Sequence, residues 1–309
     1  MQVLEFILLI LSSGLPCVLL ALGIFLTYRI LDFADLTAEG SFLIGASLTA
    51  LIIHFGVNPF VATLVGALGG AVCGLITGFL NRILKIPKLL SGIITMTAMT
   101  SIAMLIMGLG SSSVFNNRMD VDGNKTIFSL FYPGNEWNTL VEVAVMVIVV
   151  VIVIIGLYYF FGTEYGMAIR ATGMNEKMAE SQGINTTVAT IVCVAVSNAL
   201  IGLGGALYVQ DMGAVEITSA SGYLVVGLAS ILIGEAVFGK KSFKNWLISV
   251  SLGSVVYFLI ITLAQEAGFD THLMTLLYAI LITFALCLPA IKKGILSLFK
   301  KKDKDVKEV

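Results

Sequence analysis

The chain has 309 residues, of which 58% are hydrophobic and 12% are charged, whereas soluble domains average about 25% charged residues. The apolar residues come in runs of about 20, the length of a helix that crosses roughly 30 Å of hydrocarbon. This composition excludes a soluble globular protein. It predicts an all-α, polytopic membrane protein in which residues 1–309 form a single transmembrane domain.

Nine apolar segments are predicted, and the positive charges indicate their orientation. The segments are 3–27, 41–56, 59–81, 88–109, 139–161, 187–209, 222–238, 246–264 and 271–290. The second is short and follows a charged stretch, so we expect a re-entrant or broken helix. If the polar loop 162–186 is cytoplasmic, every lysine and arginine except Arg118 and Lys125 falls on that side, as the positive-inside rule requires. We therefore expect a multi-pass protein of the bacterial cell membrane with a cytoplasmic basic tail, residues 291–309.

Acidic residues gather before the second segment. The residues are Asp32, Asp35 and Glu39, which precede the segment by 2 to 9 positions. Thr37 or Ser41 could cap the helix that follows. Carboxylates are also favoured at any solvated helix start because of the helix dipole. The pattern therefore allows either an ordinary helix start or a motif with a role of its own.

The third segment carries a small residue at every fourth position. These residues are Ala62, Gly66, Gly70, Gly74 and Gly78. Such a ladder lets two helix backbones approach closely in a membrane. We expect it to pack helices within the subunit, with a second copy of the chain as the alternative partner. Residues 201–206 echo residues 66–71 in a segment that runs the opposite way, which suits an inverted repeat.

The fourth segment combines hydroxyl groups with methionines, and Ser91, Thr95 and Met99 are spaced four apart along it. A mildly polar, adaptable face suits the wall of a solute pathway, although hydroxyls in a helix also bond their own backbone. Asn198 in the sixth segment has no such easy internal partner, so it should face protein or water. These four residues are the pathway candidates.

The longest external loop, residues 110–138, is rich in aromatic side chains. Residues 121–125 are typical of a turn between two short extended runs. The aromatic residues that follow are Phe128, Phe131, Tyr132 and Trp137. The loop suits a plug of the outer mouth, a contact with another protein, or a packed surface lid.

The polar loop 162–186 contains a short helix with its own start and stop signals. Asn175 suits the N-cap of a helix over residues 175–182, and Gly183 suits its C-terminal stop. A helix of this length is unstable alone in water. It therefore either docks on something or belongs to an ordinary solvated loop.

Two stretches of the sequence resemble the permeases of ABC importers. Residues 170–173 (Arg-Ala-Thr-Gly), followed by residues 179–185 (Ala-Glu-Ser-Gln-Gly-Ile-Asn), are similar to the cytoplasmic loop of those permeases. Residues 35–37 (Asp-Leu-Thr) with residues 40–41 (Gly-Ser) are similar to the opening of their second span. The resemblance is closest to the branched-chain amino acid and ribose permease family, and it covers about residues 31–289.

The resemblance implies that two copies of the chain, or one copy and a close relative, form the pathway in the fold of an ABC importer transmembrane domain. It also implies ATPase subunits that bind the cytoplasmic loop and an external binding protein that delivers the substrate. The short helix of the loop would then be the coupling helix, which sits in a groove of the ATPase. The residues implied in this contact are Arg170, Asn175, Glu176, Lys177, Ala179, Glu180, Ser181, Gln182, Gly183 and Ile184.

ATP binding by this chain itself is rejected. Residues 234–241 resemble a phosphate-binding loop, but Lys241 stands where serine or threonine should bind magnesium. ATP and magnesium are therefore expected on the partner ATPase, and no cofactor is expected on this chain. Glu235 in the same stretch would be costly at the bilayer centre, so we expect it to pair with Lys240 and Lys241.

No catalytic or metal-binding set is expected. The cysteines stand singly in apolar segments, without metal-ligand or disulfide spacing: Cys17, Cys73, Cys193 and Cys287. His54 and His272 lie near external ends without catalytic partners, which makes an intramembrane enzyme a poor alternative. An ion-coupled carrier would need several buried carboxylates, and only Glu235 and Glu142 come near. No nucleic acid partner is expected.

The pathway candidates are small and neutral, which suits a zwitterion, a sugar or a nucleoside. The resemblance extends to tryptophan and tyrosine-type systems and favours an amino acid. The sequence therefore predicts the permease subunit of an ATP-driven amino acid importer. The alternatives are an ABC permease for a sugar or a nucleoside and an ion-coupled carrier.

Overall fold

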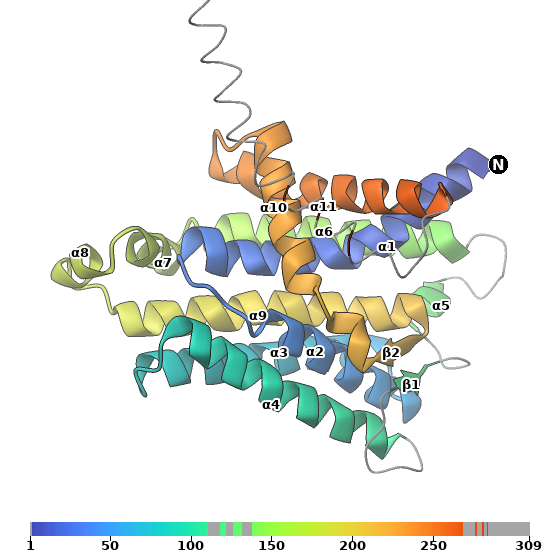
Figure 1. The fold of residues 1–309 in the computed structure, drawn as a ribbon, viewed down its shortest axis with the longest axis horizontal. Coiled ribbons are helices and arrows are strands. Elements are labelled where there is room, and N and C mark those ends of the chain that lie inside the picture. The colour runs from blue at the N-terminus through green and yellow to red at the C-terminus, as the bar shows by residue number, and fades with distance from the viewer. Residues whose placement is uncertain are drawn as a thin grey trace, which may run out of the picture.

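A computed structural model describes residues 2–110, 118–121, 126–131 and 138–267, together with residues 276, 280 and 283. Helices dominate these residues (Figure 1). The long helices are α1 (Gln2–Phe25), α2 (Ala38–His54), α3 (Pro59–Arg82), α4 (Lys88–Leu109), α6 (Asn138–Phe160), α9 (Thr186–Met212), α10 (Tyr223–Phe238) and α11 (Phe243–Glu266). The shorter elements are the π-helix η1 (Leu26–Ile30), β1 (Arg118–Asp120), α5 (Ile127–Phe131), α7 (Glu164–Met174), α8 (Glu176–Ser181), β2 (Ala214–Glu216) and the 3-10 helix η2 (Ile217–Ala220).

Seven helical stretches of the described residues are long and apolar enough to cross a membrane. They are Ile10–Ile30, Pro59–Arg82, Lys88–Leu109, Thr139–Phe160, Thr186–Met212, Ile217–Phe238 and Phe243–Glu266. The prediction of an all-α polytopic protein is confirmed. The segment 271–290 lies almost wholly outside the described residues and the tail 291–309 entirely so, and the count of nine segments stays a prediction.

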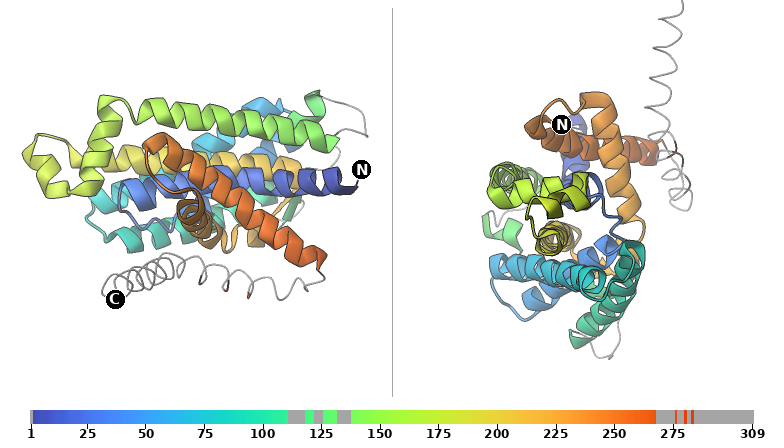
Figure 2. Two further views of the ribbon diagram at one scale, coloured as in Figure 1. Left: turned by 90° about the horizontal axis from the view of Figure 1, so that it is seen from above. Right: turned by 90° about the vertical axis from the view of Figure 1, so that its left-hand side faces the viewer.

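The two ends of the helical bundle differ in charge. α7 and α8 lie at one end, which we call the basic end; the ribbon of β1 and β2 lies at the other, the ribbon end, where α1 also begins (Figures 1 and 2). At the basic end, Arg82 forms an ion pair with Glu176 of α8, and Lys88 Nζ lies 3.0 Å from the Asp32 carbonyl oxygen. Arg118 lies in β1 at the ribbon end. This separation of charge is the one predicted for the two sides of a membrane, and the compartment that each end faces stays a prediction.

The second segment is a short, continuous helix preceded by an irregular segment, so the expected broken helix is not seen within α2 and a re-entrant path stays a prediction. The chain leaves η1 at Ile30, runs without a regular helix from Leu31 to Thr37, and only then enters α2. α2 has 17 residues, fewer than the roughly 20 that a full crossing needs. The segment 31–37 therefore brings backbone and polar side chains into the bundle, where a continuous helix would have satisfied its own backbone.

α9 lies in the centre of the bundle and contacts α1, α2 and α3. The α3 glycines that meet α9 or its neighbour α2 are Gly66, Gly69, Gly70, Gly74 and Gly78. A Cβ added at Gly70 would lie 2.9 Å from the Gly202 Cα, and one at Gly74 would lie 2.8 Å from the Ala195 Cα. The small residues thus allow two backbones of one subunit to touch. Both α3 and α9 supply glycine to this contact, which accounts for the echo between residues 66–71 and 201–206; an inverted repeat stays a prediction.

The described part of the loop 110–138 differs from the expected pair of extended runs. β1 pairs antiparallel with the distant β2, and the residues after the turn form the helix α5. Thr126 and Ser129 exchange hydrogen bonds of 2.9 and 3.3 Å at the start of that helix, a capping pattern that competes with a strand. The second of the two expected extended runs is therefore wrong, and all but the first residue of the expected turn 121–125 lies outside the described residues. Phe128 is buried, and residues 132–137 also lie outside the described part of the chain.

Candidate functional site

α7 and α8 form a helix pair at the basic end of the bundle. Thr163 caps α7, where its Oγ1 accepts a hydrogen bond from the Gly166 N–H at 3.3 Å. Asn175 caps α8, where its Oδ1 accepts from the Met178 N–H at 3.1 Å. Asn175 is extended, with φ −160° and ψ 100°, so it separates the two helices. The predicted N-cap at Asn175 is confirmed.

α8 ends in a Schellman motif around Gly183. The Gly183 N–H donates to the Glu180 carbonyl oxygen at 2.9 Å, and the Ile184 N–H donates to the Ala179 carbonyl oxygen at 3.1 Å. Gly183 has φ +81°, in the left-handed region that favours glycine at this position. The short helix therefore starts and stops where its local chemistry predicts.

The coupling candidates divide between the subunit and solvent. Ala179 is buried, and Glu176 pairs with Arg82 of α3. The Glu180 Oε1 accepts a hydrogen bond from Thr186 Oγ1 of α9 at 2.8 Å. The candidates that are exposed besides Glu180 are Arg170, Asn175, Lys177, Ser181, Gln182 and Gly183, while Ile184 is half-buried. One part of α8 thus holds the helix to the bundle, and the other part faces solvent.

Three methionines of α7 and α8 are strongly exposed. Met167 is 54% exposed, Met174 is 89% exposed and Met178 is 63% exposed. Methionine is flexible and polarisable and is common on surfaces that bind proteins, and exposed apolar side chains outside membrane spans indicate an interaction surface. Arg170 lies nearby on α7, with its Cζ 5.1 Å from the Phe243 ring centroid. These side chains give the basic end the character of a protein-binding surface.

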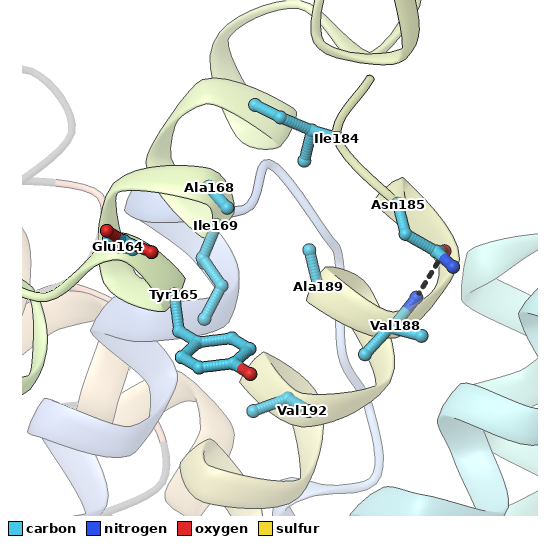
Figure 3. Close-up of a pocket in the computed structure, with 9 residues that line it drawn as sticks. All are labelled: Glu164, Tyr165, Ala168, Ile169, Ile184, Asn185, Val188, Ala189 and Val192. Atoms are coloured by element: carbon cyan, nitrogen blue, oxygen red, sulfur yellow. Dashed lines mark hydrogen bonds between the residues drawn. The ribbon is translucent and has the colours of Figure 1, made fainter. Parts of the chain in front are cut away.

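A groove of about 340 Å³ separates α7 from the first turns of α9 (Figure 3). Its lining residues are Glu164, Tyr165, Ala168, Ile169, Ile184, Asn185, Val188, Ala189 and Val192. The walls are mostly aliphatic, and the Asn185 Oδ1 already accepts the Val188 N–H at 3.1 Å. The groove offers no set of metal ligands, and no such cluster occurs elsewhere in the described part of the chain.

The last turn of α7 lies directly on the end of η1. A Cβ on Gly173 would overlap the Ile30 carbonyl oxygen and lie 2.9 Å from the Leu31 Cα, so a larger residue does not fit there. η1 is a π-helix, a form that occurs often at functional sites. A movement of the last turn of α7 towards η1 would therefore push on Ile30 and on the segment 31–37 that follows it.

Arg82 connects three helices at the basic end. Its Nη1 forms the ion pair with Glu176 of α8, and its Nη2 donates to Thr190 Oγ1 of α9 at 2.6 Å. Arg82 is the last residue of α3. α8 is therefore fixed both to the end of α3 and, through Arg82, to α9.

Glu235 pairs with a residue that is distant in the sequence. Its Oε2 lies 2.6 Å from Arg29 Nη2, and its Oε1 accepts a hydrogen bond from Trp246 Nε1 at 3.0 Å. Gly239, with φ +79°, turns the chain after α10, and the Lys240 Nζ lies 5.9 Å from the Trp246 ring centroid instead. The expected pairing of Glu235 with the neighbouring lysines is therefore wrong, because the turn directs Lys240 elsewhere and Arg29 reaches the carboxylate.

A buried polar cluster lies where the segment 31–37 and the start of α2 meet α3 and α9. Asp35 is 6% exposed; its Oδ2 accepts from Asn198 Nδ2 at 2.7 Å, and its Oδ1 accepts the Thr37 N–H at 2.9 Å. The Asn198 Oδ1 accepts from Ser41 Oγ at 2.6 Å. The Thr37 and Thr77 hydroxyl oxygens lie 2.7 Å apart. We call these five residues the central polar cluster.

The cluster explains why the expected caps of α2 do not form. Thr37 stands at the N-cap position of α2 but makes no side-chain cap bond. Its hydroxyl and that of Ser41 join other helices, because buried polar groups need partners. Asn198 faces protein, one of the two environments expected for it. Its Nδ2 also donates to the Val194 carbonyl oxygen of its own helix at 2.9 Å, so the expected lack of a partner within the helix is wrong. The sequence signal for the cluster was the carboxyl of Asp35 at the edge of an apolar run, and its partners could not be inferred from spacing.

The other pathway candidates lie in a helix contact. Ser91, Thr95 and Met99 are buried on the side of α4 that meets α2, where a Cβ on Gly40 would lie 3.3 Å from the Met99 Cβ. The Ser91 Oγ donates to the Lys88 carbonyl oxygen at 2.7 Å, and Thr95 Oγ1 donates to the Ser91 carbonyl oxygen at 3.0 Å. The structure does not join these hydroxyls to Asn198 by a hydrogen bond, and a role in the pathway stays a prediction for all four.

A family model described as "Branched-chain amino acid transport system / permease component" matches residues 6–287. The chain belongs to this family. The predicted family is thereby confirmed, and the protein is a transport-system permease with membrane-spanning helices.

Relatives of the permease transport different solutes. It is 34% identical over 273 residues to the tyrosine transport system permease protein of Clostridioides difficile (strain R20291), with 88% of each chain covered. It is 30% identical over 257 residues to the probable branched-chain amino acid transport permease protein LivH of Methanocaldococcus jannaschii, with 78% of each chain covered. It is 22% identical over 229 residues to the ribose import permease protein RbsC of Escherichia coli (strain K12), covering 73% of the permease and 64% of that relative. No solved structure matches the chain.

Replacing Asn198 by leucine is expected to destabilise the permease by about 3 kcal/mol, because it leaves buried groups of Asp35 and Ser41 without hydrogen bonds. The matched control is Thr95→Val, which removes a hydroxyl that bonds only its own helix and should change the free energy of unfolding by less than about 1 kcal/mol. Thermal unfolding of the two variants in the same detergent measures the difference. Equal unfolding temperatures would show that the central polar cluster is not a stabilising contact.

Proposed function

We propose that this permease is the membrane subunit of an ATP-driven importer that moves an amino acid into the cytoplasm, and that an ATPase subunit binds α7 and α8. The observation that carries the proposal is the helix pair itself. It stands outside the spans, exposes Met174 and Met178, and is tied to the bundle by Glu176 and Gly173. A surface that is both exposed and firmly attached is what a partner needs in order to transmit force.

The contacts give the force a route to the middle of the bundle. Movement of α8 acts on α3 through the ion pair of Glu176 with Arg82, and movement of α7 acts on η1 through Gly173. η1 leads into the segment 31–37, whose Asp35 is bonded to Asn198 of α9. ATP binding and hydrolysis on the partner would thus change the positions of α2, α3 and α9 relative to one another. Such a switch requires that the ATPase contact the two states differently.

Two further partners complete the proposed complex. A second copy of the permease, or a close relative, forms the other wall of the pathway, and an external binding protein delivers the substrate to the ribbon end. The basic end then faces the cytoplasm of a bacterial cell, in agreement with the positive-inside rule. ATP and magnesium belong to the ATPase in this arrangement.

An amino acid is the favoured substrate. The support comes from the tyrosine transport permease that covers 88% of the chain at 34% identity, and from the family description itself. A sugar or nucleoside is the alternative, since ribose and D-allose permeases are among the more distant relatives. Uptake of labelled tyrosine, leucine and ribose by the reconstituted complex separates these substrates.

The ion-coupled carrier has one observation in its favour, the buried carboxyl of Asp35. Buried carboxylates inside a membrane protein often bind protons or cations. A carrier would move its solute with an ion gradient and without a second polypeptide. Uptake by the permease alone in gradient-loaded vesicles tests this reading, and we expect none.

The double substitution Lys177→Glu with Met178→Asp is expected to weaken binding of the ATPase at least about tenfold, because side chains central to an interface contribute about 2 kcal/mol or more. Both side chains are exposed, so the permease itself should fold normally. Co-purification of the ATPase with tagged permease measures the loss.

The control for this experiment is Lys244→Glu, which reverses an exposed charge in the first turn of α11 at the same end. It should leave the amount of co-purified ATPase unchanged. If the Lys177→Glu/Met178→Asp variant bound the ATPase with unchanged affinity, the proposed docking surface would be wrong.

A further inference from the structure

A small polar pocket lies between α7, α8 and the ends of α3 and η1. Its volume is about 200 Å³, and its lining residues are Leu31, Asp32, Arg82, Lys88, Thr172, Gly173, Met174, Asn175 and Glu176. Polar atoms make up most of its wall. Pockets for drug-sized ligands measure about 300–1,000 Å³, so this one suits a smaller molecule. We call it the joint pocket, because it lies at the contact through which α7 and α8 act on the bundle.

The positive side of the joint pocket is formed by Lys88 and Arg82. The Lys88 ammonium has three donors, and one of them bonds the Asp32 carbonyl oxygen at 3.0 Å. Arg82 donates from Nη1 to Glu176 and from Nη2 to Thr190. Its Nε is buried and has no hydrogen-bond partner in the described part of the chain. The pocket therefore has Lys88 donors free for a ligand within the described residues, and the Arg82 guanidinium adds positive charge beside them.

The negative side is formed by Asp32, Glu176 and the end of α7. Asp32 is exposed and makes no ion pair within the described residues. Its φ of +51° is a left-handed conformation that aspartate tolerates better than most residues. Thr172, Gly173 and Met174 form the last turn of α7, where backbone carbonyls without helical partners carry partial negative charge.

We propose that the joint pocket binds the head of a free amino acid, with its carboxylate at Lys88 and Arg82 and its ammonium at Asp32 and the α7 carbonyls. The lining has two basic and two acidic side chains, so their formal charges sum to zero. A simple anion or cation would therefore meet like charge as well as opposite charge. A zwitterion matches both sides at once. The volume of about 200 Å³ is enough for the head of an amino acid.

Occupancy of the pocket slows import, because the ligand fills the space between α7 and the Leu31–Asp32 turn. It would hold α7 and α8 in their present position relative to η1 and α3. An amino acid that accumulates on the basic side would then inhibit its own transport. This consequence rests on the proposed function, whereas the binding step does not depend on it.

The binding experiment uses the full-length permease in nanodiscs without ATPase or binding protein. Labelled L-tyrosine should bind the wild type, and Lys88→Gln and Asp32→Asn should each weaken binding about tenfold or more, the effect of losing a hydrogen bond between charged groups. The control is Lys85→Gln, in the link between α3 and α4 and outside the lining, and it should bind like the wild type. Unchanged binding by both lining variants would overturn the proposal.

Ligand analogues test, on the wild-type protein, whether binding needs both charges of the amino acid. N-acetyl-tyrosine lacks the ammonium and tyrosine amide lacks the carboxylate, so each should bind about tenfold more weakly than tyrosine or worse. Equal binding of either analogue would contradict the assignment of charges. Phosphatidylethanolamine also carries both charges, so binding is repeated in nanodiscs with and without it. Tyrosine binding that occurs only in its absence would identify the lipid head group as the occupant and overturn the proposal.

The transport experiment uses vesicles that contain the whole complex and enclosed ATP. Tyrosine enclosed on the basic side should lower the initial uptake rate of the wild type and leave that of Lys88→Gln unchanged. Equal inhibition of both proteins, or inhibition of neither, would contradict inhibition through this pocket. Absence of any ATP-driven uptake would instead contradict the proposed function, and the binding result would stand by itself.

Discussion

Leucine at position 70 is expected to prevent stable assembly of the permease, whereas leucine at position 72 of the same helix should be tolerated. Gly70 touches the α9 backbone: a Cβ there would overlap the Asn198 carbonyl oxygen and lie 2.9 Å from the Gly202 Cα. Val72 is 51% exposed on the opposite side of α3. Overpacking a core that can adjust costs about 1–3 kcal/mol, and contact with backbone leaves little room to adjust, so we expect about 4 kcal/mol or more for Gly70→Leu.

The yield of monodisperse protein after detergent extraction and its unfolding temperature measure this effect. A milder variant, Gly78→Ala, gives a graded comparison, because its Cβ would lie 3.1 Å from the Ile191 Cα and a shift of a few tenths of an ångström would accommodate it. The expected order of stability is Val72→Leu, then Gly78→Ala, then Gly70→Leu. If Gly70→Leu unfolded at the wild-type temperature, the close contact of α3 with α9 would be wrong.

Features set by neighbouring residues were predictable from the sequence. The apolar run 139–161 became Thr139–Phe160, and 246–264 falls within Phe243–Glu266. The start and stop of α8 were also predictable, because Asn175 and Gly183 act on the backbone within a few residues. Local chemistry determines such elements, so one sequence is enough to find them.

Contacts between distant residues left no comparable signal. Arg29 and Glu235 are 206 residues apart, and Asp35 and Asn198 are 163 residues apart. Neither periodicity nor spacing connects such pairs, so Glu235 was assigned to the wrong partner. Both pairs join segments that become neighbours only once the helices have packed.

Polarity alone also could not separate function from packing. Ser91 and Thr95 form a polar stripe, yet their hydroxyls bond carbonyl oxygens of their own helix, and such a stripe needs no water. Glu176 and Lys177 are adjacent in sequence, but one side chain contacts the bundle and the other faces solvent. Glu176 is turned to Arg82, while Lys177 is exposed. The direction of each side chain depends on how α8 docks, which a short polar sequence does not determine.

Reversing the charge of Glu176 is expected to reduce ATP-driven import more than about tenfold while the ATPase stays bound. Glu176→Arg places a guanidinium against Arg82, and like charges at that distance repel strongly where water is partly excluded. The exposed side chains of α8, Lys177 and Met178, remain in place to hold the ATPase. Two measurements are compared: the uptake rate of vesicles without enclosed amino acid, and the amount of ATPase that co-purifies with the permease. A lower uptake rate with unchanged co-purification means that the ATPase still binds but no longer moves the bundle.

The double variant Arg82→Glu with Glu176→Arg restores the opposite charges in exchanged positions. If the ion pair transmits movement from α8 to α3, this variant should import faster than either single variant, and the interaction appears as non-additivity in the double-mutant cycle. Recovery should be incomplete, because Arg82 also donates to Thr190 of α9, and glutamate cannot donate that bond. If the import rate of the double variant equals the rate expected from adding the two single losses, α8 acts on the bundle by another contact. The other contacts at this end are the hydrogen bond of Glu180 with Thr186 of α9 and the packing of Gly173 of α7 on η1.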